Sequence, residues 1–175
     1  MLILASVFVA LVLPFAPQAT GQLTFKAPDA WKPRPAASAM RVAEFILPKA
    51  EGDPEDGDVV VYYFGGQGGN VDANINRWLG QMQQPDGKPT TSVAKRTTRT
   101  VNGLELSLLD VPGTYVAEVR PGSTAHFNKP GFRMVAVVVP TARGPYFIKM
   151  LGPDKTVQRW SASFDDFLGT LAYKQ

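Results

Sequence analysis

Short blocks of apolar residues, bounded by turn residues, recur through the chain after residue 21. Blocks of this length predict β-strands. In the first half they place strands at residues 22–28, 40–47 and 59–64. The third block, V-V-V-Y-Y-F, is apolar at every position, which is typical of a central strand that is buried on both faces.

Two segments carry the spacing of an amphipathic helix instead. From residue 71 to residue 82, apolar side chains recur on one helical face, and Asn70 stands at the N-cap position. A segment rich in proline and glycine predicts that this helix ends near Gln84. Pro153 opens the second helix, whose broad apolar stripe runs through residues 157–171.

The second half of the chain contains the clearest hairpin. Strands at residues 92–101 and 104–111 are separated by Asn102-Gly103, a dipeptide that tolerates the backbone angles of a type I′ turn. Pro112-Gly113 predicts a break after the second of these strands. Further strands are expected at residues 114–119, 132–139 and 146–151.

The order of these elements is three strands, a helix, three or four strands and a closing helix. This order predicts an α+β fold, with a curved antiparallel sheet of about six or seven strands and helices packed on it. Residues 22–175 have the usual length of one domain, so we expect a single α+β domain there.

The segment before this domain is typical of an export signal. An apolar run over residues 2–15 is followed by the small-residue segment A-P-Q-A-T-G. The run contains Pro14 and is shorter than the roughly 20 residues of a membrane-spanning helix. We therefore predict a signal peptide at residues 1–21, an exported protein that is periplasmic or extracellular, and no integral membrane span after cleavage. Retention of the leader as an anchor is the alternative.

Composition excludes several kinds of chemistry. The chain has 18 basic and 15 acidic residues, a balance too mild to indicate binding to nucleic acid. It has no cysteine, so disulfides, thiolate metal sites and cysteine nucleophiles are excluded. His126 is the only histidine, which excludes metal sites built from two or three histidines of one chain. We expect no metal and no cofactor.

Four segments together resemble the Mog1/PsbP-like fold family: L-T-F-K-A-P-D-A-W at residues 23–31, the strand–helix junction after Tyr63, the V-N-G-L hairpin, and K-T-V-Q-R-W-S-A-S-F-D-D-F-L at residues 155–168. The resemblance covers nearly all of the chain after the leader and rests on packing and turn signals. It implies a curved antiparallel sheet with helices on its faces. Family members include a photosystem extrinsic subunit, a regulator of a nuclear small GTPase and many uncharacterised bacterial exported proteins, and this chain is most similar to the last group. A shared fold does not imply a shared activity.

The loop G-G-Q-G-G-N lies between a strand and a helix. Backbone N–H groups and the helix dipole hold phosphate or carboxylate groups at such a junction, which makes Gly66, Gly68, Gly69 and Asn70 candidate ligand-binding residues. The lysine of a P-loop and the third glycine of a dinucleotide-binding fingerprint are missing. The favoured interpretation is that the glycines allow a tight turn from the strand into the helix.

The segment from Glu51 to Asp58 gathers five carboxylates and suggests calcium. Aligning Gly57 with the glycine of an EF-hand loop places Tyr63 where a bidentate glutamate belongs. We therefore predict a solvated, flexible hairpin loop without a metal.

A long polar loop at residues 120–133 is the second candidate for ligand binding. Arg120, Lys129 and Arg133 are suited to meet an anionic group, and His126 lies among them. The alternative is a solvated crossover whose aromatic residues cover the edge of the sheet.

His126 also permits a hydrolase hypothesis, with Ser123 or Ser107 as nucleophile. No G-x-S-x-G segment accompanies these serines. We favour His126 as a surface residue and predict no catalytic residues. The function that we expect is non-catalytic binding, or an accessory role in an envelope assembly. A small-ligand or anion-binding module is the alternative, so the partner is either a protein or a small anionic ligand.

Overall fold

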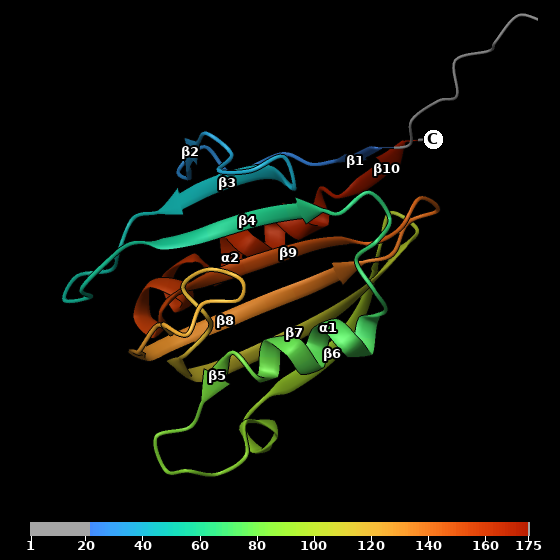
Figure 1. Ribbon diagram of the computed structural model, residues 1–175. Coiled ribbons are helices and arrows are strands. Elements are labelled where there is room, and N and C mark those ends of the chain that lie inside the picture. The colour runs from blue at the N-terminus through green and yellow to red at the C-terminus, as the bar shows by residue number, and fades with distance from the viewer. Residues whose placement is uncertain (1–21, 175) are drawn as a thin grey trace, which may run out of the picture.

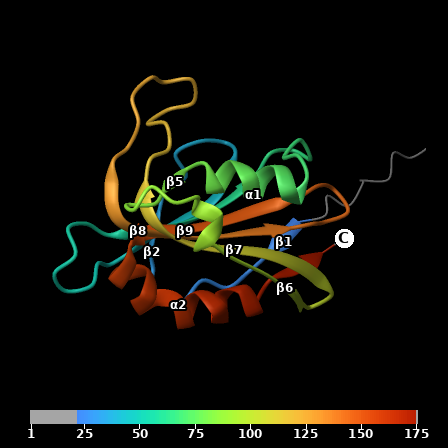
Figure 2. The same cartoon turned by 90° about the horizontal axis from the view of Figure 1, so that it is seen from below.

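The computed structural model describes residues 22–174, and its centre is a curved antiparallel sheet with one helix on each side (Figures 1 and 2). α1 spans Val71–Leu79 and α2 spans Asp154–Gly169. The predicted signal peptide lies outside the described residues. Neither of the two helices in the described part is long and apolar enough to cross a membrane.

The main sheet has eight strands, and all of its pairs are antiparallel. Its order is β2-β3-β4-β9-β8-β7-β5, and β6 also pairs with β7. A second, two-stranded sheet joins β1 to β10 at the two ends of the described chain. The strands are β1 Gln22–Thr24, β2 Lys32–Arg34, β3 Arg41–Leu47, β4 Gly57–Tyr63, β5 Met82–Gln83, β6 Lys95–Val101, β7 Leu104–Tyr115, β8 Lys129–Val139, β9 Tyr146–Pro153 and β10 Ala172–Lys174.

The face of the sheet beneath α2 carries the larger core. Strand side chains alternate between faces, so Val61 and Ile148 point toward α2, where they meet Phe164 and Phe167. All four are 2% exposed or less, and burying each such side chain stabilises the fold by about 1.5–3 kcal/mol. Trp31 packs on Phe167 with ring centroids 5.1 Å apart. The core explains why the stripe of α2 is apolar.

The other face is only partly covered by a helix. α1 lies over β7 and β8, and its Trp78 reaches Phe147 near the start of β9, with ring centroids 6.1 Å apart. On this same face, no helix in the described part of the chain lies over the other half, which is formed by β3, β4 and the part of β9 beyond Phe147. Polar side chains such as Glu44, Asp58 and Lys149 stand on this open half.

Two predictions made from neighbouring residues, the turn at Asn102-Gly103 and the helix cap at Asn70, were confirmed. Asn102 and Gly103 have φ angles of 48° and 80°, as a type I′ turn requires. The Asn70 side chain caps α1 by accepting a hydrogen bond from the Ala73 amide at 2.8 Å. Both elements depend on residues within a few positions of one another.

Non-local pairing overturned two expectations about where elements end. The first helix ends at Leu79, because Met82 and Gln83 pair with β7 as β5. β7 continues through Pro112-Gly113, where a register irregularity accommodates the glycine. The predicted curved antiparallel sheet is confirmed, and its eight strands include the short β5 and the short edge strand β2, whose Pro33 is tolerated at an edge.

Candidate functional site

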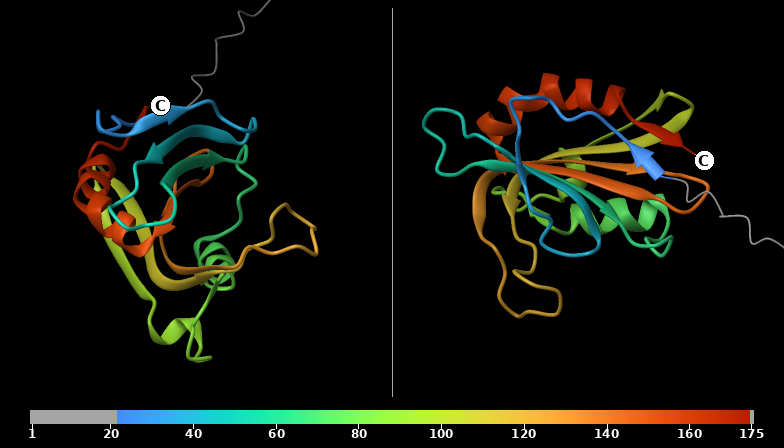
Figure 3. Two further views of the ribbon diagram at one scale, coloured as in Figure 1. Left: turned by 90° about the vertical axis from the view of Figure 1, so that its left-hand side faces the viewer. Right: turned by 90° about the horizontal axis from the view of Figure 1, so that it is seen from above.

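A cleft of about 790 Å³ lies on the α1 side of the sheet, over the half that α1 leaves open. β4 and β9 form its floor, the C-terminal end of α1 forms one wall, and residues 116–128 form the other. Figures 2 and 3 show this segment rising on the same side of the sheet as α1, with α2 on the opposite side. We call this hollow the open-face cleft.

Residues 116–128 form an ordered finger. The amide of Val119 donates to the Ala125 carbonyl at 3.0 Å, and the amide of Phe127 donates to the Ala117 carbonyl at 2.9 Å. The Phe127 ring stacks on Tyr115 with centroids 5.4 Å apart. The finger is therefore tied to the end of β7 and forms a fixed wall of the cleft.

Lys149 occupies the floor of the open-face cleft. It lies directly opposite Val60 in the β4–β9 ladder, and Asp58 is its diagonal neighbour on the same face. The Lys149 ammonium group stands 5.5 Å from the centre of the Tyr115 ring. Within residues 22–174 no hydrogen bond or ion pair satisfies this ammonium group.

The surroundings of Lys149 shift several pKa values. Burial lowers the pKa of Lys149, although the charge of Asp58 opposes the change. Burial raises the pKa of Asp58 and of Tyr62, and it raises the pKa of Tyr115 to about 12. Groups with shifted pKa values that gather in a cleft are a marker of functional sites.

Charges at the edge of the cleft are paired, unlike Lys149. The Glu44 carboxylate, with its side chain 1% exposed, accepts hydrogen bonds from Arg34 at 2.9 Å and from the Ala37 amide at 2.6 Å. Arg41 lies 2.9 Å from the same carboxylate. Burial opposes ionisation of Glu44, but these donors and positive charges hold its pKa below the ordinary value.

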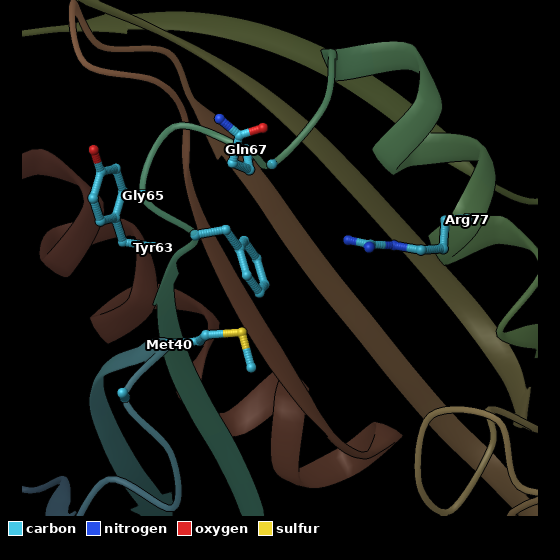
Figure 4. A pocket seen from close by; sticks show the side chains of 8 residues that line it. Met40, Tyr63, Gly65, Gln67 and Arg77 are labelled. Atoms are coloured by element: carbon cyan, nitrogen blue, oxygen red, sulfur yellow. The ribbon is translucent and has the colours of Figure 1, made fainter.

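A second pocket of about 570 Å³ adjoins the cleft beneath the loop that follows β4. Met40, Phe64 and Gly68 line it, and Arg77 lines both hollows. Figure 4 shows the Arg77 side chain reaching from α1 across the opening, while the Tyr63 ring points away from it. That ring stacks on Tyr146, with centroids 4.4 Å apart.

Comparisons with known proteins bear on the fold. No protein-family model and no curated protein matches the chain. Among solved structures, it is similar to PA94, a protein of unknown function from Pseudomonas aeruginosa, at 15% identity and a TM-score of 0.52, covering 87% of this chain and 98% of that one. It is also similar to LpqN, which is involved in cell envelope biogenesis of Mycobacterium tuberculosis, at 10% identity and a TM-score of 0.53. The match covers 89% of this chain and 85% of LpqN. Cyanobacterial PsbP from Synechocystis sp. PCC 6803 matches at 11% identity and a TM-score of 0.46, and the match covers 87% of this chain and 92% of PsbP.

The fold is Mog1/PsbP-like. The resemblance that the four sequence segments indicated is thereby confirmed at the level of fold. At identities of 15% and below, these likenesses extend no further than the architecture.

In this Mog1/PsbP-like fold the glycine loop is packed tightly. A Cβ at Gly68 would clash with the Phe147 ring, and the Gly66 backbone leaves no room for one at Gly144. Gly69 has a φ of 75°, and the Gly68 carbonyl accepts a hydrogen bond from Asn74 at 2.7 Å. These contacts give the glycines a packing role, and Gly68 in addition lines the second pocket.

The basic residues of the 120–133 segment do not converge. His126 and Lys129 line the open-face cleft, whereas Arg120 lies exposed on the finger. Arg133 points to the α2 side and binds both oxygens of Asp110, at 2.7 and 2.6 Å. The structure therefore does not bring Arg133 together with Lys129.

The single histidine has a backbone partner. His126 Nδ1 lies 3.0 Å from the Val116 carbonyl, which can only accept a hydrogen bond. Among residues 22–174, neither Ser107 nor Ser123 hydrogen bonds to the His126 ring. The described residues thus contain no hydrogen-bonded serine–histidine pair built on His126.

The acidic segment at residues 51–58 is held in place, contrary to the expectation of a flexible loop. Asp53 accepts two hydrogen bonds from Thr156, and Glu55 lies 2.6 Å from Lys129. In the described part of the chain, no group of three or more histidine, aspartate or glutamate side chains is placed to hold a metal. Asp58 belongs to the cleft instead.

The block V-V-V-Y-Y-F suggested that one of its tyrosines lines a groove, and Tyr62 does line the cleft, but sequence reasoning missed Lys149, Tyr115 and Arg77. A signal for one of them was present, because Lys149 is a single charge inside the otherwise apolar block Y-F-I-K-M-L of β9. A charge at the centre of a sheet is costly unless something pairs with it.

Proposed function

We propose that this chain is an exported, single-domain protein that binds the anionic group of a ligand in the open-face cleft and performs no catalysis. The observation that carries the proposal is the Lys149 ammonium group, which stands on the floor of the cleft with no hydrogen-bonding or ion-pair partner among residues 22–174. A role as an accessory of an envelope assembly is compatible with this binding function.

The physical argument concerns desolvation. A half-buried ammonium group loses part of its hydration and gains no hydrogen bond in return, which costs free energy. A carboxylate or phosphate placed beside Lys149 would form a charge-assisted hydrogen bond. Tyr62 and Tyr115 also line the cleft, and their hydroxyl groups can donate to the same anion.

Two observations support the proposed location. The predicted leader at residues 1–21 is of the export type. The fold is shared with LpqN, a protein involved in cell envelope biogenesis. Localisation of a tagged full chain in fractionated cells tests this part of the proposal, because a protein found in the cytoplasm with its leader intact would contradict it.

The binding proposal is tested by titrating the protein with acetate, phosphate and benzoate while following backbone amide signals by NMR. We expect shifts confined to the open-face cleft, and their loss in Lys149→Met. Lys95→Met is the matched control, because Lys95 is an exposed lysine on β6, away from the cleft. Equal shifts in wild type and Lys149→Met, or no shifts in the wild type, would contradict the proposal.

A further inference from the structure

We propose that the ligand is an amphiphilic organic anion that binds as a monomer, with its acid group at Lys149 and its apolar part in the second pocket. This inference rests on the function proposed above. It assigns a ligand class to two hollows that together form one groove along β4.

Three features join the hollows. Arg77 lines both of them. Tyr62 lines the cleft and Phe64 lines the pocket, two residues further along the same face, with ring centroids 6.0 Å apart. Arg41 and Met40 are neighbours that line the cleft and the pocket, respectively. A ligand can therefore pass from one hollow to the other along the strand.

The two ends of the groove differ in chemistry. The cleft end holds Lys149 with two tyrosines, and the Asp58 carboxylate beside Lys149 lies 3.9 Å from Arg34. The pocket end is lined by Met40 and Phe64, and the charged residue among its lining residues is Arg77, at the border with the cleft. Met40 keeps 52% of its surface exposed, and methionine adapts readily to apolar ligands. An acid with an apolar tail matches this polarity, whereas an inorganic anion would leave the apolar end unused.

The length of the groove indicates a ligand of moderate size. Val60 lies opposite Lys149, and Phe64 is four residues further along. At the rise of an extended strand, these positions are about 13 Å apart. The hollows measure about 790 and 570 Å³, within the range of small-molecule sites. A medium-chain carboxylic acid can reach from Lys149 to Met40.

A chain-length series tests the inference. Dissociation constants are measured for acetate, hexanoate and decanoate, with decanol as the neutral analogue. Each methylene group that enters the apolar end should tighten binding about fourfold. The ¹³C methyl signal of Met40 should shift with decanoate and stay unchanged with acetate.

Variants separate this inference from the proposed function. Met40→Gln should weaken decanoate binding at least about fourfold, equivalent to one methylene group, without changing acetate binding. Lys149→Met should weaken binding of every acid and leave decanol binding unchanged. Val93→Gln is the control, because Val93 is 40% exposed and lies outside both hollows.

The outcomes are distinguishable. Acids that bind through Lys149 with no gain from chain length, or no effect of Met40→Gln, would overturn the ligand class and leave the proposed function standing. Acid binding that is unchanged in Lys149→Met would overturn both proposals. Co-sedimentation with phosphatidylglycerol vesicles that depends on Lys149 would show a lipid surface as the anion, and would contradict binding of a monomer.

Discussion

The carboxylate of Asp53 accepts hydrogen bonds from the Thr156 amide at 2.8 Å and from its hydroxyl at 2.6 Å, although the two residues are 103 positions apart. Thr156 lies in the first turn of α2, whose N-cap residue, Pro153, makes no side-chain cap. The first amide groups of a helix have no partner within the helix. The loop between β3 and β4 therefore supplies the cap that α2 lacks.

Asp53→Ala should lower the free energy of unfolding by about 1–2 kcal/mol, the usual value of a helix cap. Urea denaturation measures this change. Glu51→Ala is the matched control, since Glu51 is exposed in the same loop and should change stability by no more than about 0.5 kcal/mol. Equal effects of the two substitutions would show that the cap contributes nothing.

Glu44→Gln should cost about 2 kcal/mol at neutral pH, because it removes charge-assisted hydrogen bonds to a buried carboxylate. The folded-state pKa of Glu44 lies below its ordinary value of 4.5. The unfolded chain thus binds more protons between these two pKa values, and the stabilisation disappears as pH falls through the folded-state pKa. Unfolding curves of wild type and variant should converge in acid, and a constant gap would contradict this linkage.

Lys149→Met should change the pH dependence of stability in the alkaline range. Burial holds the pKa of Lys149 below its ordinary value of 10.5. At pH values between the folded-state pKa and 10.5, the unfolded chain therefore binds more protons than the folded chain. The free energy of unfolding of the wild type should therefore rise with pH relative to the variant. Denaturation between about pH 7 and pH 9.5, below the ordinary tyrosine range, measures this. Parallel profiles for the two proteins would contradict a lowered pKa.

The pKa values of Tyr62, Tyr115 and Tyr146 are all raised, and Tyr115 should ionise last of the three. Its pKa is raised to about 12, mainly by burial. Ultraviolet absorbance of the phenolate should show a late step that is absent from Tyr115→Phe. Because a raised folded-state pKa removes stability as pH increases, the variant should lose less stability than the wild type above about pH 10. A single titration step near the ordinary tyrosine pKa would contradict this assignment.

Gly68→Ala should destabilise the fold by about 1–3 kcal/mol, the cost of overpacking a core. The new Cβ would clash with the buried Phe147 ring. Gly169→Ala is the control, because nothing lies within 4 Å of the added Cβ. Thermal unfolding compares the two, and equal melting temperatures would show that the ring can move aside at no cost.

Local chemistry explains which expectations were correct. Asn102-Gly103 defines its own turn, and the apolar stripe of α2 identifies its buried face, since both signals act within a few residues. The helix that was expected to continue to Gln84 stopped earlier, because β7 pairs with Met82 from far along the chain. The helical spacing of apolar residues includes Met82, but it contains no information about the pairing of Met82 with the distant strand β7.

The sequence by itself determined the α+β class, the hairpin at Asn102, the cap at Asn70 and the faces of both helices, because each follows from residues close together in the chain. The tertiary structure alone decided the candidate site. Lys149, Tyr62 and Tyr115 come from three different strands, and they meet because α1 covers only half of one face of the sheet. The part of a sheet that a helix covers depends on packing between segments distant in the sequence. In this protein, that packing leaves Lys149 on the floor of an open cleft.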